Sequence, residues 1–277
     1  MPHFSHASVP LIHLTLGQNT CVVSLFGGHV LSYTQSGVEK LFVSKQAKLD
    51  GSRPIRGGIP VCWPWFGQLH PEIHEHKLAH GLVRQQLWEL DAKVSKAKSV
   101  SITLSPTDQT HPLWPQELTC QLIITLTHDH LEIKLLSHNK GEKPVPLSCA
   151  LHSYFAIDDL QETSLTGITG EYSDNANEGA IGSTPETYRF TGEVDRIHPN
   201  TDNILSTDIY HKDRPITAIT HAGHDSLVVW NPWINKSQSF VDFAEDEYLK
   251  MICVETALTQ HFELAPQSNH VLIQTIA

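Results

Sequence analysis

The sequence predicts an all-β protein, a sandwich or barrel of many short strands. Three observations support this. Short apolar β-type runs recur along the chain and are separated by turn residues such as Gly27-Gly28 and Gly37. No window of a dozen residues shows a convincing 3.6-residue apolar period, so long helices are not expected. There is also no internal repeat or linker-like stretch, and we therefore expect residues 1–277 to form one domain.

The expected strands can be assigned in chain order. A hairpin turn at His128-Asp129-His130 should join two of them. Short helical turns are expected near residues 45–49 and 244–248. The strands are expected at residues 12–16, 20–25, 30–33, 41–43, 100–104, 118–127, 131–136, 226–230, 249–255, 261–264 and 271–276.

Composition narrows the possible partners and location. The formal net charge is −11, a charge that repels nucleic acid and anionic lipid. No apolar stretch approaches 18 residues, and the N-terminus lacks a signal-peptide pattern. The five cysteines are odd in number and none form a C-x-x-C pair, which favours buried reduced thiols. We expect a cytoplasmic monomer that binds neither nucleic acid nor membrane.

Several enzyme classes lack their usual sequence signatures. The chain has no G-x-S-x-G nucleophile elbow, no P-loop and no strand–G-x-G-x-x-G–helix unit. The hydrolase, kinase and dehydrogenase interpretations therefore lose their usual support.

Two segments have compositions suited to the wall of a binding pocket. Residues 56–67, RGGIPVCWPWFG, combine glycines, prolines and aromatics in a way that makes a poor strand but a rigid loop. We expect Trp63 and Phe66 in this loop to contact substrate, although a loop that only caps the core is equally compatible. Residues 80–84, HGLVR, place His80 and Arg84 beside a glycine, and a solvated loop is the alternative.

Two further residues are candidates for proton transfer. His152 lies in an apolar run, where a histidine is more often a core residue than a catalyst. Strand periodicity places Glu255 on the same face as Met251 and Cys253. A carboxylate in apolar company is unfavourable unless it is paired or lines a site, so Glu255 is the strongest single indication of chemistry in the sequence.

A histidine-rich segment raises the possibility of a metal site. It contains His70, His74, His76 and His80. The segment is loop-like and lacks the fixed helical spacing of H-E-x-x-H sites, so we expect no metal.

Taken together, these segments resemble the aldose 1-epimerase superfamily, and more closely its hexose-6-phosphate 1-epimerase branch. The matching pieces occur in the family's order and cover nearly the whole chain. They are GHVLSY at residues 28–33, RGGIPVCWPWFG at 56–67, HGLVR at 80–84, HSYF at 152–155, DRI at 195–197 and CVE at 253–255.

The resemblance implies a fold, a reaction and residue roles. The fold would be a large antiparallel β-supersandwich with an open sugar cleft. The reaction would interconvert the α and β anomers of hexose 6-phosphates without any cofactor. His152 and Glu255 would be catalytic, while Arg56, His80, Arg84 and Asp195 would bind substrate.

The reaction itself explains the residue types. Anomers interconvert through the open-chain aldehyde, which requires one acid and one base that exchange roles on reclosure. A histidine and a carboxylate suit this task because both can titrate near neutral pH. Two alternatives stay open: a carbohydrate-binding sandwich without catalysis, and a glycoside hydrolase with Asp195 and Glu255 as its carboxylate pair.

Overall fold

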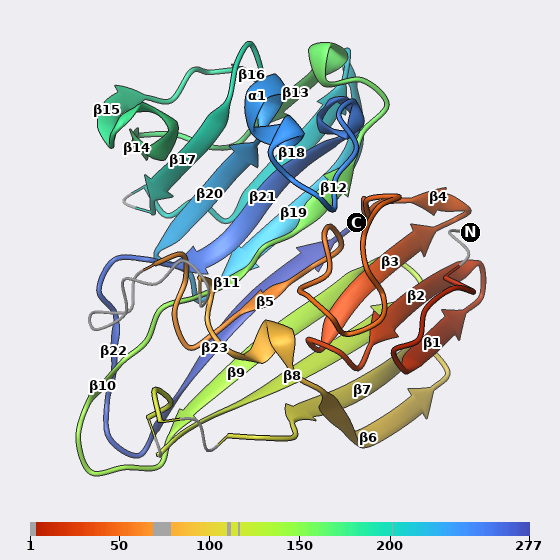
Figure 1. Cartoon of the computed structure of the whole chain (residues 1–277), viewed down its shortest axis with the longest axis vertical. Coiled ribbons are helices and arrows are strands. Elements are labelled where there is room, and N and C mark those ends of the chain that lie inside the picture. Colours follow the sequence, from red (N-terminus) through yellow and green to blue (C-terminus); the bar gives the residue numbers. More distant parts are fainter. Residues whose placement is uncertain (1–3, 69–78, 110–111, 116, 201) are drawn as a thin grey trace.

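In the computed structural model, the chain forms two large antiparallel sheets and two small ones (Figure 1). The structure describes residues 4–68, 79–109, 112–115, 117–200 and 202–277. The largest sheet has nine strands, in the order β16 (Tyr188–Arg189), β13 (Thr163–Thr166), β18 (Ser206–His211), β19 (Arg214–Ala222), β23 (Ser268–Ile276), β9 (Leu131–Asn139), β8 (Leu118–Thr127), β7 (Ser99–Pro106) and β6 (Trp88–Lys96).

The second large sheet has eight strands and carries most of the cleft described below. Its order is β15 (Ala180–Ser183), β14 (Glu171–Asp174), β17 (Val194–Pro199), β20 (Ser226–Asn231), β21 (Met251–Leu258), β11 (Cys149–Leu151) and β5 (Val61–Cys62), and β12 (Tyr154–Ala156) also pairs with β21. The regular strand structure is interrupted between β11 and β12, where residues 152–153 belong to neither strand.

Two smaller sheets complete the β-structure. One contains β1 (Leu11–Leu16), β2 (Asn19–Ser24), β3 (His29–Gln35) and β4 (Val38–Glu39), and it contacts β7 and β8. The other pairs β10 (Val145–Pro146) with β22 (Glu263–Leu264). The helical segments that the described residues form are short: α1 (Trp233–Gln238) and the 3₁₀ turns η2 (Val83–Gln85), η3 (Leu160–Glu162), η4 (Asn175–Asn177) and η5 (Glu247–Lys250).

Burial patterns explain how the sheets pack. Strands β7, β8 and β9 alternate strictly between buried and partly exposed residues, so one face of the nine-stranded sheet is covered. Every residue of β20 and β21 is buried, so both faces of the other sheet are covered at its centre. One continuous core contains side chains from both large sheets and from the four-stranded sheet. The architecture is the antiparallel β-sandwich that the sequence predicts.

Some local predictions were confirmed and others were wrong. Strand β8 has the expected bounds, and all five cysteines are buried and unpaired. Residues 41–43 form isolated bridges instead of a strand, and residues 45–49 contain a turn instead of a helix. The expected helical turn at 244–248 corresponds to η5, shifted toward the C-terminus. Within the described residues, no helix is both long and apolar enough to cross a bilayer.

Candidate active site

A cleft of about 870 Å³ lies on the face of the eight-stranded sheet turned away from the nine-stranded sheet. Glu255 and Thr256 are neighbours on β21, so they point to opposite faces, and Thr256 bonds inward to Gln274 of β23. The strands β17, β20 and β21 supply the floor through Asp195, Trp230 and Glu255. The cleft also includes Arg56, Phe66, Ala79, His80, Arg84, His152, Tyr154, Asn175, Lys236 and Phe240.

Two loops form one wall of the cleft and hold each other in place. The amide of His80 donates to the Gly67 carbonyl (2.8 Å), and the Gly67 amide donates to His80 Nδ1 (3.2 Å). The amide of Leu82 donates to the Trp63 carbonyl (2.9 Å). Because Nδ1 of His80 accepts a hydrogen bond, the neutral ring carries its proton on Nε2, which leaves Nε2–H as a donor. Burial, together with Arg84 and Arg56, lowers the pKa of His80 to about 3.

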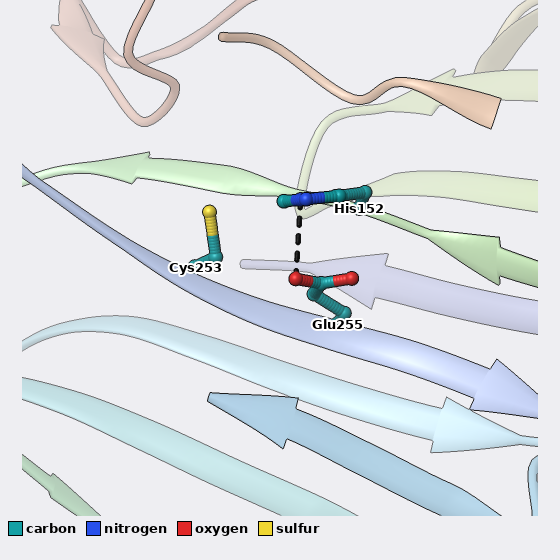
Figure 2. A group of neighbouring side chains, drawn as sticks. All are labelled: His152, Cys253 and Glu255. Carbon is teal, nitrogen blue, oxygen red and sulfur yellow. Dashed lines mark ion pairs between the residues drawn. The ribbon is translucent and has the colours of Figure 1, made fainter. Parts of the chain in front are cut away.

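His152 and Glu255 meet in the cleft, 3.2 Å apart between Nδ1 and Oε1. Figure 2 shows the carboxylate beneath the face of the imidazole ring, not in its plane. This placement explains why Nδ1 makes no hydrogen bond with any described residue, and among those residues Glu255 Oε2 has no partner either. The ring of His152 also stacks on the ring of Tyr154, with the two centroids 5.0 Å apart. The pair is thus in contact without being locked by a mutual hydrogen bond.

The surroundings shift the pKa values of this pair in opposite directions. Glu255 is 1 % exposed, and burial raises the pKa of its carboxyl well above the usual value; Asp195 adds to the rise and Arg84 opposes it. Burial lowers the pKa of His152 well below its usual value, and His80, Arg84 and Arg56 lower it further. A carboxylate with a raised pKa is a stronger base, and an imidazolium with a lowered pKa is a stronger acid.

The two arginines of the cleft differ in their contacts. Arg56 Nε pairs with Asp242 Oδ1 at 3.2 Å, its Nη1 donates to the Tyr154 hydroxyl, and its guanidinium lies 4.3 Å from the centre of the Phe240 ring. Arg84 contacts the Cys62 thiol, and its buried Nε has no hydrogen-bond partner among the described residues. Arg56 is therefore braced, whereas Arg84 retains an unused buried donor.

The opposite side of the cleft is acidic but partly neutralised. Asp195 Oδ1 accepts a hydrogen bond from Asn175 Nδ2 (3.1 Å), and Asp195 Oδ2 lies 3.5 Å from Lys236 Nζ. Lys236, on helix α1, is closer still to Glu193, at 2.8 Å. Carboxylate, amide and ammonium groups side by side can both accept and donate hydrogen bonds to sugar hydroxyls.

The structure brings most of the sequence-predicted site residues together, with one exception. Trp63 is fully buried in the core, where its ring packs on Trp114 at 4.5 Å and its Nε1–H donates to Ser137 Oγ. The prediction that Trp63 contacts substrate was wrong, because its face of the loop points to the core. Phe66 does line the cleft, edge-on to His80.

Sequence reasoning missed several residues of the cleft. Tyr154 could have been found, because it lies two positions after His152 on an extended segment. Lys236 carried no comparable signal, because α1 is only six residues long and lies far from every motif. Trp230, Asn175 and Phe240 also line the cleft and were likewise not expected from the sequence.

Of the histidine-rich segment considered as a metal site, His80 lies among the described residues and lines the cleft. His70, His74 and His76 lie outside the described residues. Within the described part, His152, Cys253 and Glu255 place one donor atom each within 4.8 Å of one another. A metal binds a histidine nitrogen in the ring plane, whereas the Glu255 carboxylate lies below that plane (Figure 2), so the ring would have to turn before the three groups could share an ion.

A second hollow, of about 490 Å³, lies on the other side of the loop after β4 and is less suited to acid–base chemistry. Its lining includes the half-buried carboxylate of Glu39 and the buried carboxylate of Glu247. Glu39 accepts hydrogen bonds from the hydroxyl of Ser32 and the amide of Tyr33, and Glu247 accepts them from Ser44 and the amide of Lys45. Neither carboxylate is free to exchange a proton with a ligand.

Comparison with known proteins identifies the family of the chain. The family model described as aldose 1-epimerase matches residues 10–272. A protein of Escherichia coli (strain K12) named "Putative glucose-6-phosphate 1-epimerase" is 32 % identical over 244 residues, which are 84 % of this chain and 78 % of the relative. A protein of Cenchrus ciliaris with the same name is 30 % identical over 257 residues, which are 88 % of this chain and 76 % of that protein.

Solved structures show the same fold. The crystal structure of a "putative mutarotase" from Salmonella typhimurium superposes with a TM-score of 0.86 at 27 % identity, covering 97 % of this chain and 90 % of the other. A "galactose mutarotase related enzyme" from Lactobacillus acidophilus gives a TM-score of 0.72 at 11 % identity, covering 97 % of both chains, and shows the fold alone. With the family model spanning nearly the whole chain, this protein belongs to the aldose 1-epimerase family.

Proposed function

We propose that this protein interconverts the α and β anomers of hexose 6-phosphates, glucose 6-phosphate among them, with His152 and Glu255 as the proton-transfer pair. The observation that carries the proposal is the placement of these two groups 3.2 Å apart in a cleft that also contains two arginines. Membership in the aldose 1-epimerase family supports the reaction class. The names of the relatives and the arginines support a phosphorylated sugar.

The pair holds one proton throughout the reaction. Glu255 removes the proton from the anomeric hydroxyl while protonated His152 delivers one to the ring oxygen, and the ring opens to the aldehyde. After rotation about the C1–C2 bond, His152 takes the proton back from the chain hydroxyl and Glu255 protonates the new anomeric oxygen. The opposite pKa shifts favour the protonated Glu255 and neutral His152 that this opening produces over the ion pair that begins it. No electrons move, so the reaction requires no redox cofactor.

The remaining cleft residues orient the sugar. Asp195 and His80 Nε2–H are placed to bond sugar hydroxyls, and Phe66 and Trp230 offer apolar surface to the ring. Arg56 and Arg84 bind the phosphate, which must overcome the repulsive average field of a protein with net charge −11. Arginine suits this task because its planar fork donates paired hydrogen bonds to phosphate oxygens.

The decisive experiment measures anomer exchange by NMR on α- and β-glucose 6-phosphate, with aryl glycoside hydrolysis measured in parallel. We expect enzyme-dependent exchange and no hydrolysis. His152→Ala and Glu255→Gln should each lower the exchange rate by at least about 10²-fold, the usual contribution of one positioned acid or base. The double variant should be little worse than the more impaired single variant, because the two groups act as a unit.

Three outcomes would contradict this proposal in whole or in part. Hydrolysis that depends on both Asp195 and Glu255 would identify a glycosidase instead. Saturable binding of sugar phosphates without any enhanced exchange would identify a binding protein. Near wild-type exchange in either single variant would remove that residue from the catalytic role.

A further inference from the structure

A buried glutamine lies between the two large sheets, directly behind the proposed catalytic pair. Gln274, on β23 of the nine-stranded sheet, is fully buried on the same strand face as the core residues Leu272 and Ile276. An amide in such a row is strongly unfavourable unless all its hydrogen-bonding groups are satisfied. Its retention in the core therefore needs an explanation in terms of its partners.

The partners of Gln274 are the immediate neighbours of His152 and Glu255. Its Oε1 accepts a hydrogen bond from the hydroxyl of Ser153, the residue that follows His152. Its Nε2 donates to the Val254 carbonyl (3.1 Å) and to Thr256 Oγ1 (2.9 Å), one on each side of Glu255. A single side chain of one sheet thus bonds the backbone segments that carry both catalytic groups on the other sheet.

The position of His152 depends on the hydrogen bond between Ser153 and Gln274 more than the position of an ordinary strand residue would. It lies in the break between β11 and β12, where the regular ladder with β21 is interrupted. Its own amide donates to the Pro60 carbonyl (3.0 Å), and the Ser153 amide turns back to the Leu151 carbonyl (3.0 Å). The side-chain bond from Ser153 to Gln274 therefore ties this break to the nine-stranded sheet.

The hydrogen bonds continue in one direction beyond Thr256. Thr256 Oγ1 also lies 2.8 Å from His221 Nδ1, and His221 Nε2 lies 3.1 Å from Thr207 Oγ1; with the proton of His221 on Nε2, Thr256 donates to Nδ1 and Nε2–H donates to Thr207. This order requires a neutral His221, and burial lowers the pKa of His221 to about 3. The chain is satisfied at each link, so it is a rigid support.

From this arrangement we infer that Gln274 is a positioning residue for the reaction: it fixes the separation of His152 and Glu255 by holding Ser153, Val254 and Thr256. The inference rests on the proposed function, since it assigns Gln274 a role through that pair. Gln274 itself is excluded from the cleft by β21.

The test compares Gln274→Met, which keeps the side-chain length and removes the polar groups, with Leu272→Ala on the same strand face. Both variants should lose stability, because the first leaves buried polar partners and the second leaves a cavity. Only Gln274→Met should lower kcat for anomer exchange, by about 10- to 100-fold, while KM stays near the wild-type value. The phosphate and hydroxyl contacts do not involve Gln274, so binding is spared.

A second measurement does not depend on activity. The imidazole of His152 is titrated by NMR in both variants and the wild type, with its signal assigned through His152→Gln. In Gln274→Met the midpoint should move toward the ordinary histidine value, whereas in Leu272→Ala it should stay at the wild-type position. An unchanged midpoint and kcat in folded Gln274→Met would overturn the inference. A wild-type protein without anomer exchange would instead refute the proposed function and leave the titration to decide the positioning role.

Discussion

Glu255 illustrates a conflict between stability and activity at a single residue. Its pKa is raised by burial and by Asp195, against the opposing effect of Arg84. The ionised form of Glu255 is therefore less favourable in the folded protein than in the unfolded chain. Any stability that the neutral acid contributes is present below the ordinary pKa of a glutamate and is lost as the pH rises through the raised value.

Glu255→Gln should accordingly stabilise the fold while abolishing activity. The amide is neutral at every pH, so the free energy of unfolding should rise relative to wild type at pH 8, on the order of 1 kcal/mol, the usual size of a stabilising substitution. The difference should shrink as the pH falls toward the ordinary glutamate range. Urea unfolding from pH 5 to pH 8 measures it; a variant that is equally destabilised at all pH values would mean that Glu255 is stabilising where it lies.

The two cleft arginines should differ in how they affect substrate choice. Arg84→Ala should raise KM for glucose 6-phosphate by at least about tenfold, because a hydrogen bond to a charged group contributes about 1.5–3 kcal/mol. The exchange of free glucose should change little. Arg56→Ala should slow the anomer exchange of both sugars and also lower the stability of the protein, since it leaves Asp242 and Tyr154 without their partner. Equal losses on both sugars in Arg84→Ala would make that arginine structural as well.

At the same scale, the sequence predicted which residues lie in the cleft better than it predicted how they point. The motif order brought His152, Glu255, Arg56, Arg84, His80, Asp195 and Phe66 to one place. Trp63 was misplaced because an irregular loop has no fixed side-chain period, so its inward face cannot be read from spacing. The contribution of Lys236 depends on a pairing with Glu193 and Asp195 that only the folded sheet creates.

At the scale of elements, the cleft wall depends on a close approach of two loops at Gly81. Its φ is +79°, and a Cβ atom there would lie 2.0 Å from the Trp63 carbonyl oxygen. Gly81→Ala should therefore separate the two loops, displace His80 and Arg84, and reduce both stability and affinity for hexose 6-phosphate. Gly37→Ala is the matched control, because Gly37 also has a positive φ (+84°) but no atom within 4 Å of its added Cβ.

The comparison separates backbone strain from crowding. Both variants share the cost of a left-handed alanine, about 1 kcal/mol, which thermal unfolding can measure. Only Gly81→Ala should show the additional loss and a raised KM. Similar stability and KM in the two variants would show that the wall tolerates displacement.

The predictability of elements follows their burial. Strands β8 and β9 were found from the sequence because apolar residues occupy every second position, from 118 to 126 in β8 and from 131 to 135 in β9. Between residues 163 and 222 no strand was expected, because β14, β15 and β19 are largely exposed and carry few apolar residues. Residues 41–43 are apolar but only bridge to Phe155 and Gly57. Apolar periodicity identifies the strands that face the core. The other strands form because they pair with neighbouring strands, and this pairing cannot be read from the sequence pattern.

At the scale of the whole molecule, buried neutral histidines should make the fold sensitive to acid. Burial lowers the pKa of His29, His80 and His221 to about 3 and that of His198 to about 4. The unfolded chain protonates these residues near pH 6.5, so their contribution to stability is present above that pH and is lost as the pH falls toward the folded values. Each contributes a slope of up to about 1.4 kcal/mol per pH unit in that window.

Thermal unfolding between pH 7.5 and pH 4.5 should therefore show a steep fall in Tm. It should also show one transition if residues 1–277 form one domain, as the sequence predicts, because the largest core cluster joins residues from Leu14 to Ile276. His29→Gln, which removes one of these groups, should flatten the dependence by about one proton. A Tm that is flat from pH 7.5 to pH 4.5 would contradict the assignment, and two separate transitions would divide the chain into domains.

The outermost strand of the nine-stranded sheet, β6, has a consequence for how the protein behaves at high concentration. It is exposed along nearly its whole length, and Leu90 and Val94 are apolar residues on its surface. An exposed edge strand that is flat and regular is a template for adding a strand from another molecule, the first step of fibrous aggregation. The register shift between Leu90 and Ala92 twists this edge, and Glu89 and Lys93 add charge on either side of it. The irregular strand thus helps to keep crowded copies of the protein in solution.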